Sequence, residues 1–366
     1  MKVLWLSPML NHYKARFLDR LQEDFPIELT VLAGTGRDNK GDFHWNEKTG
    51  FTLIQVPVSK KKFGLSRQVR KEIEGLFQGF DWVILPKENK NLLLFIFLLN
   101  LKKKTAGKGK NVGLFTYNHP IVTEGPKKEG FFRLMVSKFY YRYYDKVIFY
   151  TEAGCQRMID MSYISSEKAY YANNTIDTVE VNRHYCFEYP DPNQPTILFI
   201  GRLIPSKRLG DLISYYRKLK TRSELRLLKL IVIGDGPESH VIEKAMESDS
   251  DIDWVGTVVD EEKIAPFMSQ ATLVFVPGHS GLSINHAFSY GRPFVTLGGI
   301  HQPPEIDYLQ HGINGLILKG NSSENIDQIG SMLINFDAAL YDRCYETGKD
   351  LSVGNWCKQI VAALEA

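Results

Sequence analysis

The chain has 366 residues, of which 43% are apolar and 24% are charged. These fractions exclude a disordered chain, a collagen-like chain and a polytopic membrane protein. The length predicts two domains, each large enough to bury its own core. The four cysteines form no CxxC pair, and no histidine cluster has zinc-ligand spacing. We therefore expect neither disulfides nor a structural metal, and a reducing, cytoplasmic location.

The charge is distributed unevenly along the chain. Residues 1–187 carry 29 basic and 19 acidic side chains, whereas residues 188–366 carry 16 basic and 23 acidic ones. The basic excess is largest in 60–146, with 19 basic and 7 acidic residues. This segment is expected to face an anionic partner. We favour the inner leaflet of a membrane over nucleic acid, because no DNA- or RNA-binding motif accompanies the basic residues.

In the N-terminal half, short apolar runs predict five strands, at 3–8, 27–34, 82–86, 112–117 and 146–151. The apolar run LLLFIFLL (92–99) is far shorter than the roughly 20 residues that span a bilayer. It predicts a buried helix beneath the first sheet. The alternative is that it joins FFRLMVSKFYYRYYDK (131–146) in a surface that rests on anionic lipid.

The segment 182–195 has three prolines and no hydrophobic period, which predicts an interdomain linker. Beyond it, apolar runs alternate with longer helical stretches, as expected for a parallel sheet with helices on both faces. The runs are 196–202, 228–234, 252–256, 272–278, 293–299 and 315–319.

The predicted fold class is therefore α/β, with two Rossmann-like, doubly wound domains that face each other across a cleft. We expect the first domain at 1–185 and the second at 186–345. A C-terminal helix at 346–366 is expected to return toward the first domain.

Two loops should meet where the strand order of the second domain reverses. The first, Gly201–Arg208, carries Arg202 and Lys207, a fork donor and a flexible ammonium suited to a diphosphate. The second, Pro277–Ser283, opens a helix whose first amides can hold an anion. Together they predict a diphosphate-binding site. The alternative is that Arg202 and Lys207 are solvated loop residues.

A further acidic cluster, Asp249, Asp251 and Asp253, has the spacing of a metal-binding DxD. It lies at the amino end of the strand 252–256, on the edge opposite the ligand loops. A solvated turn is therefore expected there, and no metal.

Five segments of the second half resemble, in order and spacing, the second domain of GT-B glycosyltransferases of the family 4 type, over residues 197–318. They are ILFIGRLIPSKRLGDLI, LIVIGDGPE, WVGTVVDEEKIAPFMSQATLVFVP, GLSINHAFSYGRPFVT and PEIDYLQHGINGLIL. The N-terminal half resembles the family more loosely, through its first strand, the turn at His119 and Asn174–Asp177.

This resemblance implies transfer of a sugar, with retention, from a UDP- or GDP-linked donor to an acceptor, without a required metal or other cofactor. The diphosphate would be bound by Arg202 and Lys207. The remaining implied donor-binding residues are Gly201, Gly256 near the base, the amides at Gly281, Leu282 and Ser283, His286, and Glu305. Glu305 is equally well explained as an acid at a helix start.

The chain departs from the family pattern at one motif. Members usually carry two glutamates eight positions apart, and the corresponding residues here are Gly278 and His286. His286 can still hydrogen-bond a ribose hydroxyl. Gly278 leaves sugar recognition to backbone amides, His279 or Ser280. A catalytically silent homologue that binds nucleotide sugars therefore stays open as an alternative. A nucleotide-sugar epimerase of the same fold is a second alternative, although it would need charged acid and base groups in the cleft, and the loss of both glutamates argues against it.

In the N-terminal half, the resemblance places His119 against the transferred sugar, as a hydrogen-bonding group. A structural or merely exposed histidine is the alternative. Asn11, His12, Tyr13 and Lys14 follow the first strand and are expected to contact the acceptor. We expect that acceptor to be a saccharide, most simply a lipid-linked one. The enzyme would then be peripheral on the cytoplasmic membrane face and would build a surface polysaccharide or glycolipid, such as lipopolysaccharide or capsule.

Overall fold

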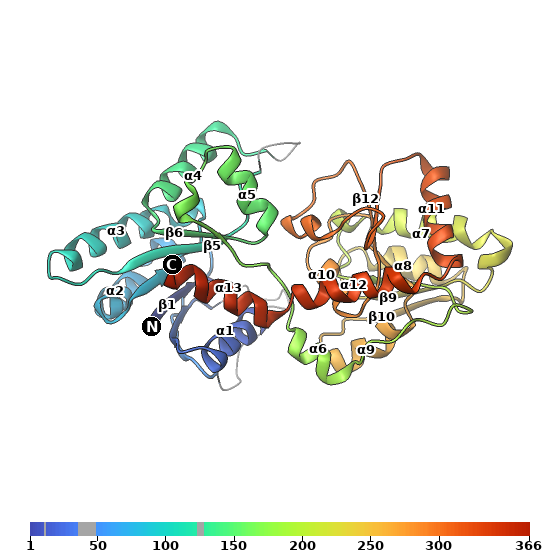
Figure 1. The fold of residues 1–366 in the computed structure, drawn as a ribbon, viewed down its shortest axis with the longest axis horizontal. Coiled ribbons are helices and arrows are strands. Elements are labelled where there is room, and N and C mark those ends of the chain that lie inside the picture. Colours follow the sequence, from blue (N-terminus) through green and yellow to red (C-terminus); the bar gives the residue numbers. More distant parts are fainter. Residues whose placement is uncertain (11, 36–48, 123–127) are drawn as a thin grey trace. The chain divides into compact units, whose positions relative to one another are not determined.

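The structure is a computed structural model that describes residues 1–10, 12–35, 49–122 and 128–366. The chain forms two compact units (Figure 1). Unit 1 comprises Met1–Asn173 and Val353–Ala366, and unit 2 comprises Asn174–Ser352.

Unit 1 is built on a parallel sheet with the order β3-β2-β1-β4-β5-β6-β7 among its described residues. All five predicted strands are present. β3 and β7, which pair at the two edges, were not predicted because each is short and incompletely buried. The strands are β1 (Lys2–Ser7), β2 (Glu28–Ala33), β3 (Thr52–Gln55), β4 (Trp82–Ile84), β5 (Gly113–Asn118), β6 (Lys146–Phe149) and β7 (Ala169–Tyr171).

The predicted helix at 92–99 is confirmed as the first part of α3, which buries Leu94, Phe95 and Leu98. Phe95 packs on the rings of Tyr140 and Tyr144, with centroids 4.6 and 4.5 Å away. Such aromatic contacts bury one face of this run, whereas Leu93 and Ile96 on the helix are exposed. The helices of this part of unit 1 are α1 (His12–Asp24), α2 (Arg67–Leu76), α3 (Leu92–Ala106), α4 (Phe131–Tyr143) and α5 (Glu152–Asp160).

The C-terminal helix α13 (Val353–Glu365) packs within unit 1, although the 179 residues before it form unit 2. Its Trp356 is 2% exposed and lies against Phe17, Trp5 and Tyr117, at centroid distances of 5.3, 6.4 and 5.9 Å. Burial of one large aromatic side chain contributes on the order of 2 to 3 kcal/mol. The end of the chain is thus part of the first unit's core, next to α1 and β1 (Figure 1).

Unit 2 contains all six strands predicted for the second half, in the order β10-β9-β8-β11-β12-β13. This order reverses between β8 and β11, as expected for a doubly wound sheet. The strands are β8 (Thr196–Ile200), β9 (Lys229–Ile233), β10 (Ile252–Gly256), β11 (Leu273–Phe275), β12 (Phe294–Leu297) and β13 (Gly315–Leu318). The helices are α6 (Thr178–His184), α7 (Leu209–Lys220), α8 (Ser239–Met246), α9 (Glu261–Gln270), α10 (Ser283–Ser289), α11 (Ser322–Ile334) and α12 (Ala338–Asp350).

Several helices begin at a polar side chain that accepts a hydrogen bond from a backbone amide of the first turn. Ser66 begins α2, Thr151 begins α5 and Asp177 begins α6 in this way. Asn321 begins α11 with a full capping box, completed by Glu324. Each such cap stabilises a helix by about 1 kcal/mol, which explains where these helices start.

The proline-rich segment 182–195, predicted as the linker, lies inside unit 2, and the units divide before Asn174. Tyr185 packs on Tyr290 with ring centroids 4.7 Å apart, and its hydroxyl donates to the Tyr290 carbonyl. Buried Arg292 donates to the carbonyl of Glu188. Prolines interrupt helices and strands but do not prevent a segment from packing. Here the aromatic side chain of Tyr185 packs the segment against unit 2.

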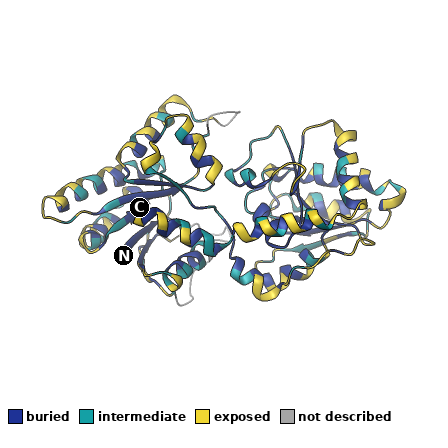
Figure 2. Cartoon of the chain, in the orientation of Figure 1, coloured by how far each residue is buried: buried dark blue, intermediate teal, exposed yellow. Residues whose placement is uncertain are grey.

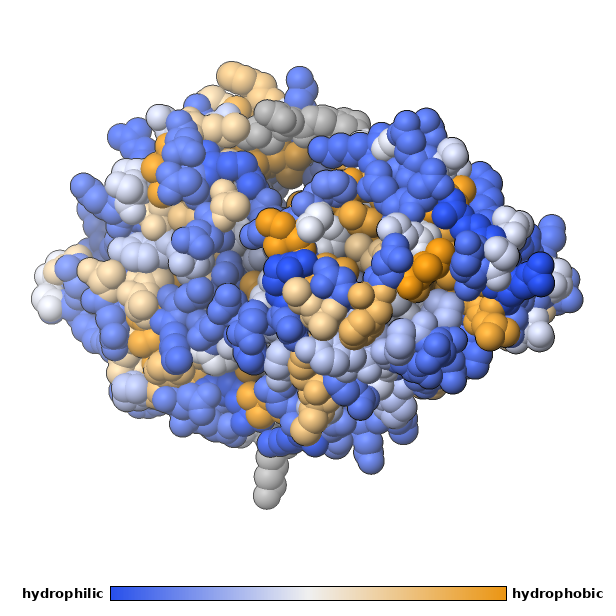
Figure 3. Space-filling model, turned by 45° about the vertical axis from the view of Figure 1, so that its right-hand side comes forward, coloured by the Kyte–Doolittle hydropathy of each residue, from blue (hydrophilic) through white to orange (hydrophobic). Residues whose placement is uncertain are grey.

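The predicted two-domain α/β architecture with parallel sheets is confirmed. Figure 2 shows buried strands and helices whose outer faces are exposed. On the face in Figure 3, hydrophilic residues predominate and apolar ones form small separate groups. Within the described residues, no helix has both the length and the apolar character that a membrane span requires.

Candidate functional site

Two loops contact each other at the carboxyl edge of the second sheet, after β8 and β11. The Gly278 amide donates to the Lys207 carbonyl (3.1 Å), and the His279 amide donates to the Ser206 carbonyl (2.8 Å). A Cβ on Gly278 would lie 2.1 Å from the Ser206 oxygen, so this close approach requires glycine. The predicted neighbourhood of these loops is therefore confirmed by β8–β11 pairing and by backbone contact.

Lys207 is held by the second loop. It is 8% exposed, and its Nζ donates to the Ser280 carbonyl at 2.9 Å. Burial lowers the pKa of Lys207 to about 8, against the opposing influence of the Glu305 carboxylate. A Cβ on Gly201 would stand 3.2 Å from this Nζ, at a backbone φ of +148°. Gly201 therefore leaves room for the ammonium at the end of β8.

Arg202, the other predicted diphosphate ligand, is exposed. It follows Gly201 directly and lies five positions before Lys207. One loop therefore carries both an exposed guanidinium and a buried ammonium.

The start of α10 lies beside the end of β8. Ser283, its first residue, donates through Oγ to the Ile200 carbonyl at 2.8 Å. Gly281 has φ +61°, a conformation that favours glycine, and a Cβ added at this position would meet no atom within 4 Å. Gln302 fixes the preceding turn, because it accepts from the Ser280 amide and donates to the Gly278 carbonyl.

Glu305 lies in the short 3-10 helix Pro304–Tyr308 and is 3% exposed. Its Oε1 accepts a hydrogen bond from Asn174 Nδ2 at 2.6 Å. Burial raises the pKa of Glu305, against the hydrogen bond from Asn174 and the attraction of Lys207. Glu305 is therefore a buried carboxyl near Lys207. It also lies in the first turn of a short helix, as the alternative interpretation supposed.

His286 forms a buried network on α10 that the sequence did not reveal. Its Nε2 lies 3.1 Å from Glu261 Oε1, and Tyr290 donates to Glu261 Oε2 at 2.8 Å. Glu261 is the first residue of α9 and is 6% exposed. Nothing in the local pattern DEEK distinguishes Glu261 from a solvated helix-start acid, so only the tertiary structure identifies it.

Gly256 ends β10 with φ +78°, and its carbonyl accepts from the Gly234 amide at 2.7 Å. Trp254 donates through Nε1 to the Gly234 carbonyl at 2.8 Å. These contacts hold the loop after β10 beside the turn after β9, on the same edge as Gly201.

The acidic cluster at 249–253 faces a lysine. Lys220 Nζ donates to Asp249 at 2.5 Å and to Asp251 at 2.7 Å. This explains two of the three aspartates as partners of a cation. In the part of the chain that the structure describes, no three His, Cys, Asp or Glu side chains gather as a metal site would require.

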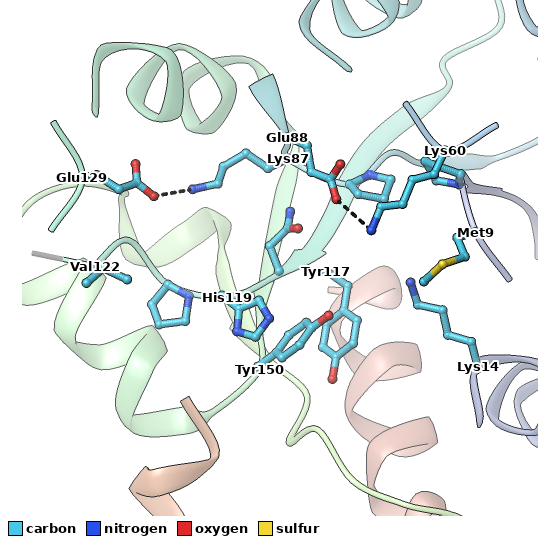
Figure 4. A pocket seen from close by; sticks show the side chains of 14 residues that line it. Met9, Lys14, Lys60, Lys87, Glu88, Tyr117, His119, Val122, Glu129 and Tyr150 are labelled. Carbon is cyan, nitrogen blue, oxygen red and sulfur yellow. Dashed lines mark ion pairs between the residues drawn. The ribbon is translucent and has the colours of Figure 1, made fainter. Parts of the chain in front are cut away.

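Unit 1 contains a cavity of about 390 Å³ at the carboxyl ends of β1, β4 and β5 (Figure 4). Its charged lining residues are Lys14, Lys60, Lys87, Glu88 and Glu129. His119 also lines it, with its ring 4.2 Å from that of Tyr150, which stacks on Tyr117 at 4.3 Å.

Lys14, which was predicted to contact the acceptor, and His119, which was predicted to contact the transferred sugar, thus line one cavity. Asn11 lies outside the described residues, and the side chains of His12 and Tyr13 are not described either. Sequence reasoning missed Lys60, Lys87, Glu88 and Tyr150, because they come from separate segments with no shared motif.

Sequence comparison identifies one family for part of the chain. Residues 194–335, all within unit 2, match the family described as "Glycosyl transferases group 1". No curated protein matches the chain significantly by sequence.

Structure comparison matches the whole chain. HepE of Anabaena, solved with UDP, is 16% identical with a TM-score of 0.71, and the match covers 100% of both chains. The lipopolysaccharide outer core galactosyltransferase WaaB is 14% identical with a TM-score of 0.68, over 100% of this chain and 99% of that one. Sucrose-phosphate synthase from Thermosynechococcus elongatus is 14% identical with a TM-score of 0.66, over 99% and 98%. These matches show the GT-B fold, and with the family match they support a glycosyltransferase.

Proposed function

We propose that the protein transfers a sugar from a nucleotide-sugar donor to a saccharide acceptor, with retention of anomeric configuration. The observation that carries this proposal is the buried Lys207 ammonium beside exposed Arg202, at the switch point of the second sheet. The family match to residues 194–335 supports the same activity. No step of the proposal requires a metal or another cofactor.

The donor diphosphate is bound by Arg202 and Lys207, with the amides at Gly281, Leu282 and Ser283. The base lies against the loop after Gly256. A uridine donor is favoured, since structures of HepE contain UDP, UDP-glucose, and UDP with glucose.

The ribose and the sugar are recognised by different kinds of group. His286, oriented by Glu261, hydrogen-bonds the ribose. No side chain fits at position 278, so the donor sugar is held by backbone amides, with His279 and Ser280 nearby and Glu305 beside Lys207. His119 hydrogen-bonds the transferred sugar.

The chemistry asked of these residues is electrostatic. The bond between the anomeric carbon and the diphosphate breaks, and its electron pair stays on the phosphate oxygen. The acceptor oxygen forms the new bond on the same face, and its proton passes to the departing phosphate. Lys207 and Arg202 stabilise the charge that develops on that phosphate.

Calorimetric titration with UDP tests the donor site. Arg202→Ala and Lys207→Ala are each expected to weaken UDP binding at least tenfold, because loss of a charged hydrogen-bond partner costs about 1.5 to 3 kcal/mol. Arg226→Ala is the matched control, since Arg226 is exposed and precedes β9, at the opposite edge of the sheet. Unchanged UDP affinity in both test variants refutes the donor site.

The acceptor is proposed to be lipid-linked, and unit 1 to dock on anionic lipid of the cytoplasmic membrane face during surface polysaccharide or glycolipid synthesis. The first turns of α4 expose Phe131, Phe132 and Met135 by 81%, 75% and 55%. The sequence of α4 holds cations and no acid, so an anionic surface matches it.

Vesicle sedimentation tests this surface. Wild-type protein should sediment with phosphatidylglycerol vesicles and much less with phosphatidylcholine vesicles. Phe131→Ser with Phe132→Ser should reduce the bound fraction severalfold, whereas Leu227→Ser, an exposed apolar residue of unit 2, should not. Equal sedimentation with both vesicle types contradicts docking on anionic lipid.

A further inference from the structure

Two oppositely charged side chains are buried at the carboxyl edge of the second sheet. Lys207 is 8% exposed and Glu305 is 3% exposed. A buried charge is unfavourable unless hydrogen bonds and an opposite charge replace the water that it has lost. The groups around Lys207 and Glu305 therefore decide in which protonation state each of them is stable and where each of them lies.

The Lys207 ammonium is held by a turn that Gln302 fixes. Lys207 Nζ donates to the Ser280 carbonyl at 2.9 Å. Gln302 Oε1 accepts from the amide and from the hydroxyl of Ser280, at 2.9 and 2.8 Å. Gln302 Nε2 donates to the Gly278 carbonyl at 3.1 Å and to Thr296 Oγ1 at 3.0 Å. These bonds fix the carbonyl that holds Lys207.

Glu305 belongs to the same segment as Gln302. The two residues between them are Pro303 and Pro304, and Pro303 is buried. Because proline restricts its own φ, the fixed position of Gln302 also limits the path of the chain to Glu305. One short segment thus carries the residue that fixes the turn around Lys207 and the carboxylate that acts on it.

Asn174 holds Glu305 from the other side. Asn174 Nδ2 donates to Glu305 Oε1 at 2.6 Å. The Asn174 carbonyl accepts from Asn285 Nδ2 at 3.0 Å and from the Tyr308 hydroxyl at 3.2 Å. The amide that binds the carboxylate is therefore anchored to α10 and to the short helix of Glu305.

The second oxygen of this carboxylate is buried without a hydrogen bond. Among the described residues, Glu305 Oε2 has no hydrogen-bond partner. Burial raises the pKa of Glu305, and Asp307 adds to this rise, whereas the bond from Asn174 and the attraction of Lys207 oppose it. The influence is mutual, because burial lowers the pKa of Lys207 to about 8 and Glu305 opposes that decrease.

We propose that Glu305 is a positioning residue for Lys207: its carboxylate keeps the buried ammonium charged and in place for the donor diphosphate, and it acts through Lys207 and not on the sugar. The inference rests on the proposed function in one respect, that Lys207 binds the diphosphate. Because the sugar takes no part, UDP is a sufficient probe.

NMR titration of the full chain with ¹³C-labelled lysine measures the charge of Lys207 directly. The Lys207 Cε signal is identified by its absence from Lys207→Ala. Its midpoint is expected near pH 8 in the wild type and about one pH unit lower in Glu305→Gln, because a nearby opposite charge is lost. Glutamine keeps an oxygen that accepts from Asn174, so the variant is expected to fold, and a thermal melt checks this. An unchanged midpoint in folded Glu305→Gln overturns the proposal.

The converse titration does not depend on the folding of Glu305→Gln. With ¹³C-labelled glutamate, the Glu305 Cδ signal is identified by its absence from Glu305→Asp. Its midpoint should be higher in Lys207→Ala than in the wild type, because the cation that stabilises the carboxylate is lost. A midpoint that stays the same in Lys207→Ala overturns the proposal.

UDP calorimetry at several pH values tests the effect on the donor site. At pH 8, Glu305→Gln should bind UDP about fivefold more weakly than the wild type, because a midpoint one unit lower leaves about one fifth as much charged ammonium. At pH 6 the two affinities should agree within about twofold, because Lys207 is charged in both proteins. A loss of the same factor at every pH indicates a purely structural role and overturns the proposal.

Two further variants serve as controls. Asp235→Asn is the matched one, because Asp235 is exposed in the turn after β9 and asparagine keeps the oxygen that accepts from the Gly236 amide. Its UDP profile should keep the wild-type midpoint, and a shift equal to that of Glu305→Gln contradicts a specific role of Glu305. In Lys207→Arg, the addition of Glu305→Gln should cause no pH-dependent loss, because arginine stays charged. Such a loss in the double variant also contradicts the proposal.

A comparison of UDP with UDP-glucose separates this inference from the donor site. Glu305→Gln should weaken both ligands by the same factor at each pH. If it weakens UDP-glucose alone, Glu305 binds the sugar and the inference fails, while the proposed function stands. If Lys207→Ala keeps UDP affinity but the lysine midpoint shifts in Glu305→Gln, the proposed donor site fails and the action of Glu305 on Lys207 stands.

Discussion

The two units share a strand order around their first strands, β2-β1-β4 and β9-β8-β11, but they build their candidate sites differently. In unit 2 the loops after β8 and β11 meet through backbone hydrogen bonds, and glycine at 278 permits the contact. In unit 1 the cavity is lined by side chains from several separate segments, among them three lysines and two glutamates.

This difference determines how each site can be recognised. A site made of backbone leaves glycines and a lysine at fixed spacing in two short segments. A site made of side chains from separate segments has no such spacing. Its lysines lie in a generally basic region, where the sequence does not distinguish a lysine of the site from a lysine exposed to solvent. The same fold can therefore contain one site that is predictable from the sequence and one that is not.

The largest effect is expected when the backbone contact of unit 2 is broken. Gly278→Ala places a Cβ 2.1 Å from the Ser206 carbonyl oxygen, so the two loops must separate. We expect a loss of about 3 kcal/mol of unfolding free energy and at least tenfold weaker UDP binding. Urea unfolding and calorimetry measure both.

Gly281→Ala is the matched control in the same loop. Its Cβ would meet no atom within 4 Å, so only the strain of φ +61° remains, about 1 kcal/mol. If the two variants lose equal stability, backbone contact is not what distinguishes the site of unit 2.

A smaller effect is expected from pH. Lys207 has a pKa of about 8 because it is buried, so its charge is present below pH 8 and is lost as pH rises through that value. UDP affinity should fall roughly tenfold between pH 7 and pH 9, about 1.4 kcal/mol. Lys207→Arg should remove this decline, because arginine stays charged. A pH dependence that persists in Lys207→Arg would assign it to another group.

The smallest effect is expected at the opposite edge of the second sheet. Lys220→Met removes the cation that Asp249 and Asp251 share, and ion pairs near the surface contribute up to about 1 kcal/mol. Unfolding free energy should fall by that amount, and UDP affinity should stay as in the wild type. Weaker UDP binding would mean that the amino edge also serves the ligand.

The strands were predictable where the sequence carries a clear apolar run, which includes the partly exposed edge strand β10. All six strands of unit 2 were predicted, since each is a short apolar run between helical stretches. β3 and β7 of unit 1 were not, because edge strands such as TLIQ and AYY carry too little apolar signal. The linker prediction at 182–195 was wrong. It rested on prolines, which are a local signal, whereas the segment is held in unit 2 by the packing of Tyr185 on Tyr290, a contact between residues far apart in the chain.

By itself the sequence determined the α/β class. It also predicted that the loops after β8 and β11 are neighbours, and it identified Arg202 and Lys207 as candidate ligands of a diphosphate. These follow from hydrophobic period and from the topology of parallel sheets. Only the tertiary structure decided that Lys207 and Glu305 are buried, that Glu261 partners His286, and that Lys14 and Lys60 line one cavity. Burial and pairing depend on contacts between residues far apart in the chain, and such contacts leave no mark in local spacing.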